Sequence, residues 1–179
     1  MKIGVLGLQG SVSEHRASME LLNTDTVEVR ESRDMKGLNG LIMPGGESTT
    51  LCKLLVNSGL WDAISRSSIP IMATCAGAIL IGKSDGTTFE KMDFGIGRNY
   101  YGRQKDSFEK DIRLDNGRTF KGVFIRAPAI TSMGSKTRAI AWDGEMVVGC
   151  VMDKHMALTF HPELTDDLTF HEMWVGGLE

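Results

Sequence analysis

The sequence has few cysteines, no long apolar run and no cluster of positive charge. Three cysteines among 179 residues do not make a disulfide framework, so we expect reduced thiols and a cytoplasmic location. The apolar stretches are strand-sized and far shorter than a membrane span, and the first residues begin a strand without the architecture of a signal peptide. Lys and Arg are scattered and the formal net charge is −3, which excludes the basic stripe that nucleic acid needs.

The composition is that of an ordinary globular protein, with 41% hydrophobic and 24% charged residues. The length suits one compact core. No repeat, low-complexity tract or linker divides the chain. We therefore expect residues 1–179 to form a single domain.

The first half of the chain predicts alternating strands and helices. Apolar or alternating runs predict strands at residues 2–8, 26–30, 40–43 and 69–73. Helical spacing predicts helices at residues 11–23, 48–58 and 76–81, the first with a capping box of Ser11 and Glu14. Such alternation is typical of a parallel sheet with helices on both faces.

The second half is richer in strands. Strand-like runs occupy residues 119–127, 138–142, 146–153 and 155–160, with hairpin turns expected at Asp143-Gly144 and Asp153-Lys154. A closing helix is expected at residues 165–175, capped by Thr165, and residues 82–97 resemble a loop. The predicted fold class is therefore α/β with three layers: a mostly parallel central sheet, helices on both faces and an antiparallel, strand-rich second half.

Cys75 stands where the strand at residues 69–73 passes into a helix, with Ala73 and Gly77 two residues away on either side. Small residues at these positions are typical of a nucleophile elbow, where a tight turn exposes one side chain at the carboxyl end of the sheet. The amide of Ala76 can then point at a developing oxyanion. The alternative is a small cysteine packed in a core, which is our interpretation of Cys52 and Cys150.

A glycine turn, Pro44-Gly45-Gly46, ends one strand and precedes Glu47 and Ser48. Paired glycines let backbone N–H groups approach a ligand, which suits an oxyanion hole or a carboxylate site. The alternative is an ordinary strand-to-helix turn. The turn is not a phosphate-binding loop, since the Gly-Lys-Ser/Thr ending is absent.

His161 and Glu163 flank Pro162. In extended backbone, residues two apart point to the same side, and proline disfavours helix at the residue before it. A carboxylate beside an imidazole fixes its tautomer and stabilises the imidazolium, as nucleophilic catalysis requires. The alternative is a surface histidine near a helix cap. His15, His155 and His171 lack such a neighbour and are expected to be structural or solvated, without metal-ligand spacing.

Six motifs occur in order between Ile3 and about Asp166. They are Gly4-Val5-Leu6-Gly7-Leu8-Gln9-Gly10, Pro44-Gly45-Gly46-Glu47-Ser48-Thr49-Thr50, Thr74-Cys75-Ala76-Gly77, Gly102-Arg103-Gln104-x-Asp106-Ser107-Phe108-Glu109, Val123-Phe124-Ile125-Arg126-Ala127-Pro128 and Phe160-His161-Pro162-Glu163-Leu164-Thr165. Together they resemble the class I (triad) glutamine amidotransferases and, among these, the glutaminase subunits of pyridoxal 5′-phosphate synthase. One departure is Ala73, where the family usually has glycine.

The resemblance implies a flavodoxin-like fold and the release of ammonia from L-glutamine. It implies Cys75 as nucleophile, His161 as base and Glu163 as its orienting partner, with an oxyanion hole at Gly46 and Ala76. The residues implied in glutamine binding are Gly46, Glu47, Ser48, Arg98, Ile125 and Arg126. No metal or organic cofactor is implied.

The partner implied is a separate synthase subunit, which uses the ammonia to build pyridoxal 5′-phosphate from a pentose phosphate and a triose phosphate. The loop Gln9-Gly10-Ser11 follows the first strand, so it should lie at the same carboxyl edge of the sheet as Cys75. We expect the synthase subunit to dock near Gln9 and Gly46 and to organise the glycine turn, so that the isolated chain has low activity.

Three alternatives remain open from the sequence. The first is another glutaminase subunit, such as that of imidazole glycerol phosphate synthase, which the segments 102–109 and 123–128 disfavour. The second is a cysteine peptidase or related hydrolase, which the Gly46-Glu47-Ser48 turn and Arg126 disfavour. The third is a regulatory module without catalysis, which a complete triad disfavours.

Overall fold

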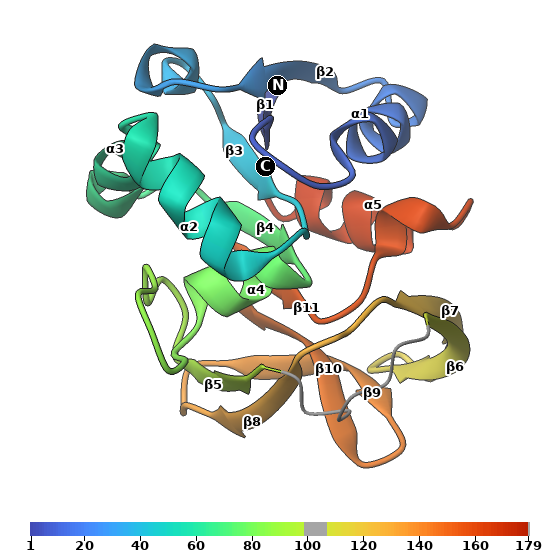
Figure 1. Cartoon of the computed structure of the whole chain (residues 1–179). Coiled ribbons are helices and arrows are strands. Elements are labelled where there is room, and N and C mark those ends of the chain that lie inside the picture. Colours follow the sequence, from blue (N-terminus) through green and yellow to red (C-terminus); the bar gives the residue numbers. More distant parts are fainter. Residues whose placement is uncertain (99–106, 179) are drawn as a thin grey trace.

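A nine-stranded sheet forms the centre of the computed structural model, which describes residues 1–98 and 107–178 (Figure 1). Five strands in the order β2-β1-β3-β4-β11 make its parallel half. They are β1 (Lys2–Leu6), β2 (Asp25–Val29), β3 (Gly40–Met43), β4 (Ile71–Thr74) and β11 (His155–Leu158). Their carboxyl ends therefore meet at one edge, where open α/β sheets place their sites.

The other half of the sheet is antiparallel and continues from β11. It contains β10 (Met146–Met152), β9 (Arg138–Asp143), β6 (Phe108–Leu114) and β7 (Thr119–Phe124). The hairpin turns predicted at Asp143-Gly144 and Asp153-Lys154 are confirmed, with positive φ at Gly144 and Asp153. A separate two-stranded sheet pairs β5 (Phe94–Gly97) with β8 (Ala129–Met133).

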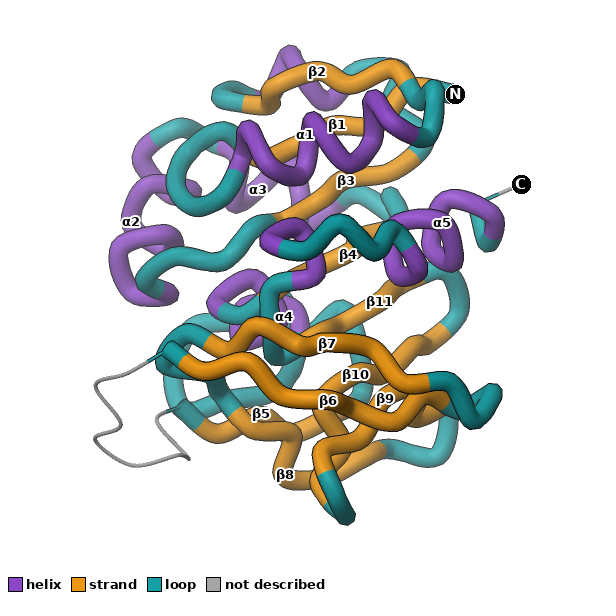
Figure 2. The backbone as a smooth tube through the Cα atoms, turned by 90° about the vertical axis from the view of Figure 1, so that its right-hand side faces the viewer, coloured by secondary structure: helices purple, strands orange, loops and turns teal. Residues whose placement is uncertain are grey.

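Helices cover both faces of the parallel half (Figures 1 and 2). One face carries α2 (Ser48–Asn57), α3 (Leu60–Arg66) and α4 (Ala76–Ile81), and the other carries α1 (Val12–Leu21) and α5 (Thr169–Gly176). The predicted α/β fold with helices on both sides of a mostly parallel sheet is therefore confirmed.

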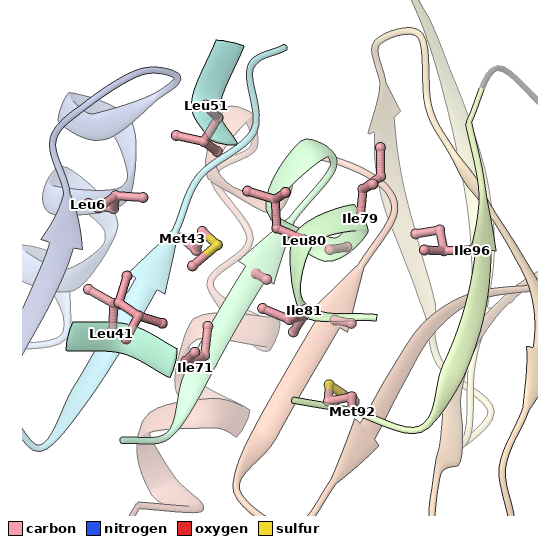
Figure 3. Close-up of a cluster of buried hydrophobic side chains, with 14 of the residues drawn as sticks. Leu6, Leu41, Met43, Leu51, Ile71, Ile79, Leu80, Ile81, Met92 and Ile96 are labelled. Carbon is pink, nitrogen blue, oxygen red and sulfur yellow. The ribbon is translucent and has the colours of Figure 1, made fainter. Parts of the chain in front are cut away.

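Alternation along the strands divides the core into two clusters. In β3, Leu41 and Met43 pack under α2 and α4, while Ile42 faces the side of α1 and α5. Figure 3 shows the first of these clusters, in which Leu51 of α2 and Leu80 of α4 lie over the strands. Strands buried on both faces read as continuous apolar runs, and this is why the sequence revealed them.

Several local predictions were wrong. Ser11 makes no side-chain capping bond at α1, and α5 begins at Thr169, because the Asp167 side chain accepts the backbone N–H of Thr169 (2.9 Å). The segment 82–97 contains β5, and α3, β6 and β8 were not predicted.

Most of the fourth motif, residues 102–106, lies outside the described residues. Within the described ranges no helix is long and apolar enough to span a membrane.

Candidate active site

Cys75 occupies a strained turn between β4 and α4. Its φ is 49° and its ψ is −108°, a positive-φ conformation that a residue with a Cβ rarely adopts. A Cβ on Gly77 would lie 2.2 Å from the carbonyl oxygen of Met43, so only glycine lets α4 approach the end of β3 so closely. The backbone N–H of Cys75 donates to the carbonyl of Leu158 (2.8 Å), which ties the turn to β11. The predicted elbow is therefore present in the fold.

His161 and Glu163 follow β11 and meet as predicted, but not for the predicted reason. His161 Nδ1 lies 2.7 Å from Glu163 Oε1. Pro162–Leu164 forms a 3-10 turn rather than an extended segment, and proline suits the first position of such a turn because no N–H is needed there. The backbone N–H of His161 donates to the carbonyl of Val123 (2.8 Å), so β7 also holds the imidazole in place.

The pKa values of His161 and Glu163 are shifted in opposite directions. Burial alone would lower the pKa of His161, but hydrogen bonds with Cys75 and Glu163, together with their charges, raise it to about 10. Burial would raise the pKa of Glu163, but His15 and His161 beside it lower it overall. The ionised carboxylate of Glu163 therefore stabilises the imidazolium form of His161.

The glycine turn packs directly against this triad. A Cβ on Gly45 would lie 2.6 Å from His161 Cε1 and 3.1 Å from Cys75 Cβ. Gly46 has a φ of 130°, and a Cβ there would lie 2.7 Å from the side-chain oxygen of Gln9. That oxygen accepts the backbone N–H of Glu47 (3.0 Å). The loop after β1 and the glycine turn are thus coupled through one side chain.

A cavity of about 510 Å³ opens over Cys75 and His161. All the residues that the sequence analysis assigned to glutamine binding or to the oxyanion hole line it. They are Gly46, Glu47, Ser48, Ala76, Arg98, Ile125 and Arg126. The sequence analysis did not assign five further lining residues to the site, which are Gly10, Ser11, Thr49, Ile79 and Pro128.

The charged residues of the cavity have different environments. The Glu47 carboxylate caps α2, accepting N–H groups of Thr49 (2.9 Å) and Thr50 (2.7 Å). The hydroxyl of Thr50 and these two N–H groups lower the pKa of Glu47 to about 2. Arg98 and Arg126 are exposed at the cavity, and Arg126 has a positive φ of 44°. The cavity therefore offers guanidinium groups to an anionic ligand, while its carboxylate is already engaged.

His15 also reaches the triad, which the sequence analysis did not foresee. His15 Nε2 lies 3.4 Å from Glu163 Oε2, and both side chains are buried. One available signal was its place on the helix after β1, whose carboxyl end lies at the same edge of the sheet as Cys75. His155 is structural, as expected, since its Nδ1 accepts the backbone N–H of Ile71 (3.1 Å). Among the described residues no group of three or more His, Cys, Asp or Glu is arranged to hold a metal ion.

Comparisons with known proteins agree with this geometry. A solved structure described as a glutamine amidotransferase matches with a TM-score of 0.91 and 36% identity, over 98% of each chain. Pyridoxal 5′-phosphate synthase subunit PdxT of Methanocaldococcus jannaschii is 44% identical over 93% of this chain and 92% of its own length. The subunit of the same name from Thermococcus kodakarensis is 42% identical over 98% of both chains.

The fold is thus that of the class I glutamine amidotransferases. More particularly, the chain belongs to the SNO glutamine amidotransferase family, whose model matches residues 5–179. The resemblance read from the six motifs is confirmed at the level of the family.

Proposed function

We propose that this protein hydrolyses L-glutamine to L-glutamate and ammonia, and supplies the ammonia to the synthase subunit of pyridoxal 5′-phosphate synthase. The observation that carries the proposal is the convergence of Cys75, His161 and Glu163 at one edge of the sheet, under a cavity with two arginines. The family and the PdxT relatives support the same substrate and the same pathway.

The reaction is acyl transfer to sulfur. The Cys75 thiolate attacks the side-chain amide carbon of glutamine, and the backbone amides of Gly46 and Ala76 hold the oxyanion. The His161 imidazolium then gives its proton to the departing ammonia. A water molecule that loses its proton to His161 hydrolyses the γ-glutamyl thioester, and this step releases glutamate and restores the thiolate–imidazolium pair. Glu163 keeps Nδ1 of His161 protonated throughout.

Glutamine is recognised at its amino-acid end by the rim of the cavity. Its α-carboxylate fits a bidentate contact with the guanidinium of Arg98 or Arg126. Arg98 Nη1 lies 3.4 Å from the hydroxyl of Thr49, which holds it toward the cavity. Because the Glu47 carboxylate caps α2, Glu47 contributes to the site through its backbone.

Docking of the synthase subunit organises the site. Ammonia released into water becomes protonated at neutral pH and loses its nucleophilicity, so its delivery benefits from contact between the subunits. The Gln9 side chain links the loop after β1 to the backbone N–H of Glu47, so a partner that binds near Gln9 can reposition the Gly45-Gly46 turn and its amide.

The proposed location is the cytoplasm, because the three free thiols suit its reducing conditions.

The test is ammonia release from glutamine by the isolated chain and by its complex with the synthase subunit. We expect low release alone, strong stimulation in the complex, and no release by Cys75→Ala in either state. Release by Cys75→Ala equal to that of the wild type would refute the nucleophile. Absence of release by the wild-type complex would refute the glutaminase proposal. Full activity of the isolated chain would show that docking serves only to deliver ammonia to the synthase subunit and does not organise the active site.

A further inference from the structure

Two buried histidines extend the triad behind Glu163. His15 of α1 and His171 of α5 both have an exposed fraction of 0%. His15 Nδ1 lies 3.0 Å from His171 Nε2. On its other side, His15 Nε2 lies 3.4 Å from Glu163 Oε2 and 3.4 Å from the hydroxyl oxygen of Thr74, the residue before the nucleophile. Glu163, His15 and His171 therefore form a row of contacting side chains that leads from the triad into the core.

Both imidazoles are neutral at physiological pH. Burial lowers the pKa of His15, and the nearby charge of His161 adds to this, while Glu163 and Glu14 oppose it. Burial and the neighbouring His15 lower the pKa of His171 to about 3. Each ring then carries one N–H and one nitrogen lone pair. The tautomer of each ring therefore decides which nitrogen donates a hydrogen bond and which accepts one.

The surroundings select one arrangement of these protons. The carboxylate of Glu163 attracts an N–H at His15 Nε2, which leaves Nδ1 as an acceptor for the Nε2–H of His171. His171 Nδ1 is then a lone pair, and this atom has no hydrogen-bond partner among the described residues. The opposite arrangement would direct a lone pair at the carboxylate and bury an unpaired N–H at His171 Nδ1. Buried unpaired N–H groups are rarer than unpaired acceptors.

Glu163 needs such a donor. Its Oε1 receives Nδ1–H of His161 at 2.7 Å, but its Oε2 has no hydrogen bond of normal length within the described part of the chain. Its side chain is fully buried, so water does not solvate the charge. A buried carboxylate without compensating dipoles becomes protonated. His15 Nε2 lies 3.4 Å from this oxygen, so an N–H on that nitrogen places the positive end of its dipole beside the carboxylate without a hydrogen bond of normal geometry.

We propose that His15 is a positioning residue for glutamine hydrolysis, whose Nε2–H holds Glu163 ionised and directed at His161. This inference rests on the proposed function and adds a fourth side chain to it. His15 does not line the cavity and does not touch substrate. It acts through the carboxylate, which stabilises the imidazolium and thereby the Cys75 thiolate. Its contact with Thr74 also connects α1 to the strand that carries the nucleophile.

The test compares His15→Gln with His15→Asn in the complex with the synthase subunit. The glutamine amide reaches about as far as Nε2 and can donate to Glu163, whereas the shorter asparagine amide occupies the place of Nδ1. Met19→Ala is the control for stability, because Met19 is fully buried one turn further along α1, packs in the hydrophobic core and carries no ionisable group. Two readouts are needed: kcat and KM for glutamine, and the pH dependence of alkylation of Cys75 by iodoacetamide, followed on its own peptide.

We expect His15→Asn to lower kcat by ~10-fold or more, by analogy with the loss of a residue that orients a metal-binding histidine or carboxylate, with KM changed by less than about 2-fold. Its alkylation profile should shift to higher pH, because the imidazolium that stabilises the thiolate is weakened. His15→Gln should recover most of the rate, and Met19→Ala should alter neither readout. Equal kcat and equal alkylation profiles for the Gln and Asn variants would overturn the proposal and leave His15 as a packing residue.

The alkylation measurement needs neither glutamine nor the partner, so it separates the two proposals. If the wild-type complex releases no ammonia, the proposed function fails, yet the shift of the alkylation profile in His15→Asn still tests the contact with Glu163. If the complex is active and the two variants behave alike, only the role of His15 fails. Should His15→Asn not fold, His171→Phe removes the donor that fixes the His15 tautomer, and an unchanged profile in that variant would also count against the proposal.

Discussion

Mild acid should destabilise this protein because it buries neutral histidines. Burial, with His15 nearby, lowers the pKa of His171 from 6.5 to about 3. The unfolded chain therefore takes up a proton at His171 below about pH 6.5, whereas the folded chain does so only near pH 3. Stability consequently falls as the pH drops from 6.5 toward 3. The difference corresponds to about 5 kcal/mol, at about 1.4 kcal/mol per pH unit, which is comparable with the ~5–15 kcal/mol that stabilises a typical domain.

The perturbation that isolates this effect is His171→Phe, which keeps an aromatic ring and removes the titrating group. The free energy of unfolding would be measured by urea denaturation, followed by circular dichroism, at several pH values between about 7 and 4. The wild type should lose stability more steeply than His171→Phe, by up to about 1.4 kcal/mol per pH unit in that window. Some slope should remain in the variant, because burial also lowers the pKa of His15 and His155.

Phe170→Leu is the matched control, since Phe170 is fully buried on the same helix and does not titrate. It should lower the free energy of unfolding at every pH without changing the slope. Parallel curves for the wild type and His171→Phe would refute the reasoning, because they would show that His171 takes up its proton equally in the folded and unfolded states.

His161 has the opposite effect on the pH dependence of stability. Its pKa in the folded protein is raised to about 10. Its contribution to the free energy of unfolding is therefore complete below about pH 6.5 and is lost as the pH approaches 10.

Three further predictions concern the active site. His161→Asn should be nearly inactive and Glu163→Gln less impaired, because an orienting partner matters less than the base; equal activity of the wild type and His161→Asn in the complex would contradict the triad. Cys75 should be alkylated in the folded protein while Cys150, whose pKa burial raises to about 12, stays unmodified at neutral pH, as peptide mass spectrometry would show. Gln9→Ala should weaken stimulation by the synthase subunit, because it removes the link to the glycine turn; stimulation of wild-type size would place the interface elsewhere.

The sequence was sufficient for features that depend on neighbouring residues. The strands β1, β3 and β4 of the parallel half are short apolar runs, and β2 alternates between polar and apolar residues. Asp143-Gly144 marks a hairpin turn, so local pattern and local chemistry agree. The elbow at Cys75 needs only small residues around a strand-to-helix turn. The pair of His161 and Glu163 lies two residues apart, and it meets in a 3-10 turn where the prediction had assumed extended backbone.

The tertiary structure alone decided which distant residues surround the triad. His15 and Thr74 are far from each other and from Glu163 and His171 in the chain, and no local spacing brings these side chains together. They meet because α1 and α5 pack on the same face of the sheet, beneath the edge where the parallel strands end. The sequence by itself was enough to predict the elbow at Cys75, the pairing of His161 with Glu163 and the glycine turn. The buried dipoles that keep Glu163 charged follow from long-range packing, because the energy of a buried charge depends on every group around it and not on its sequence neighbours.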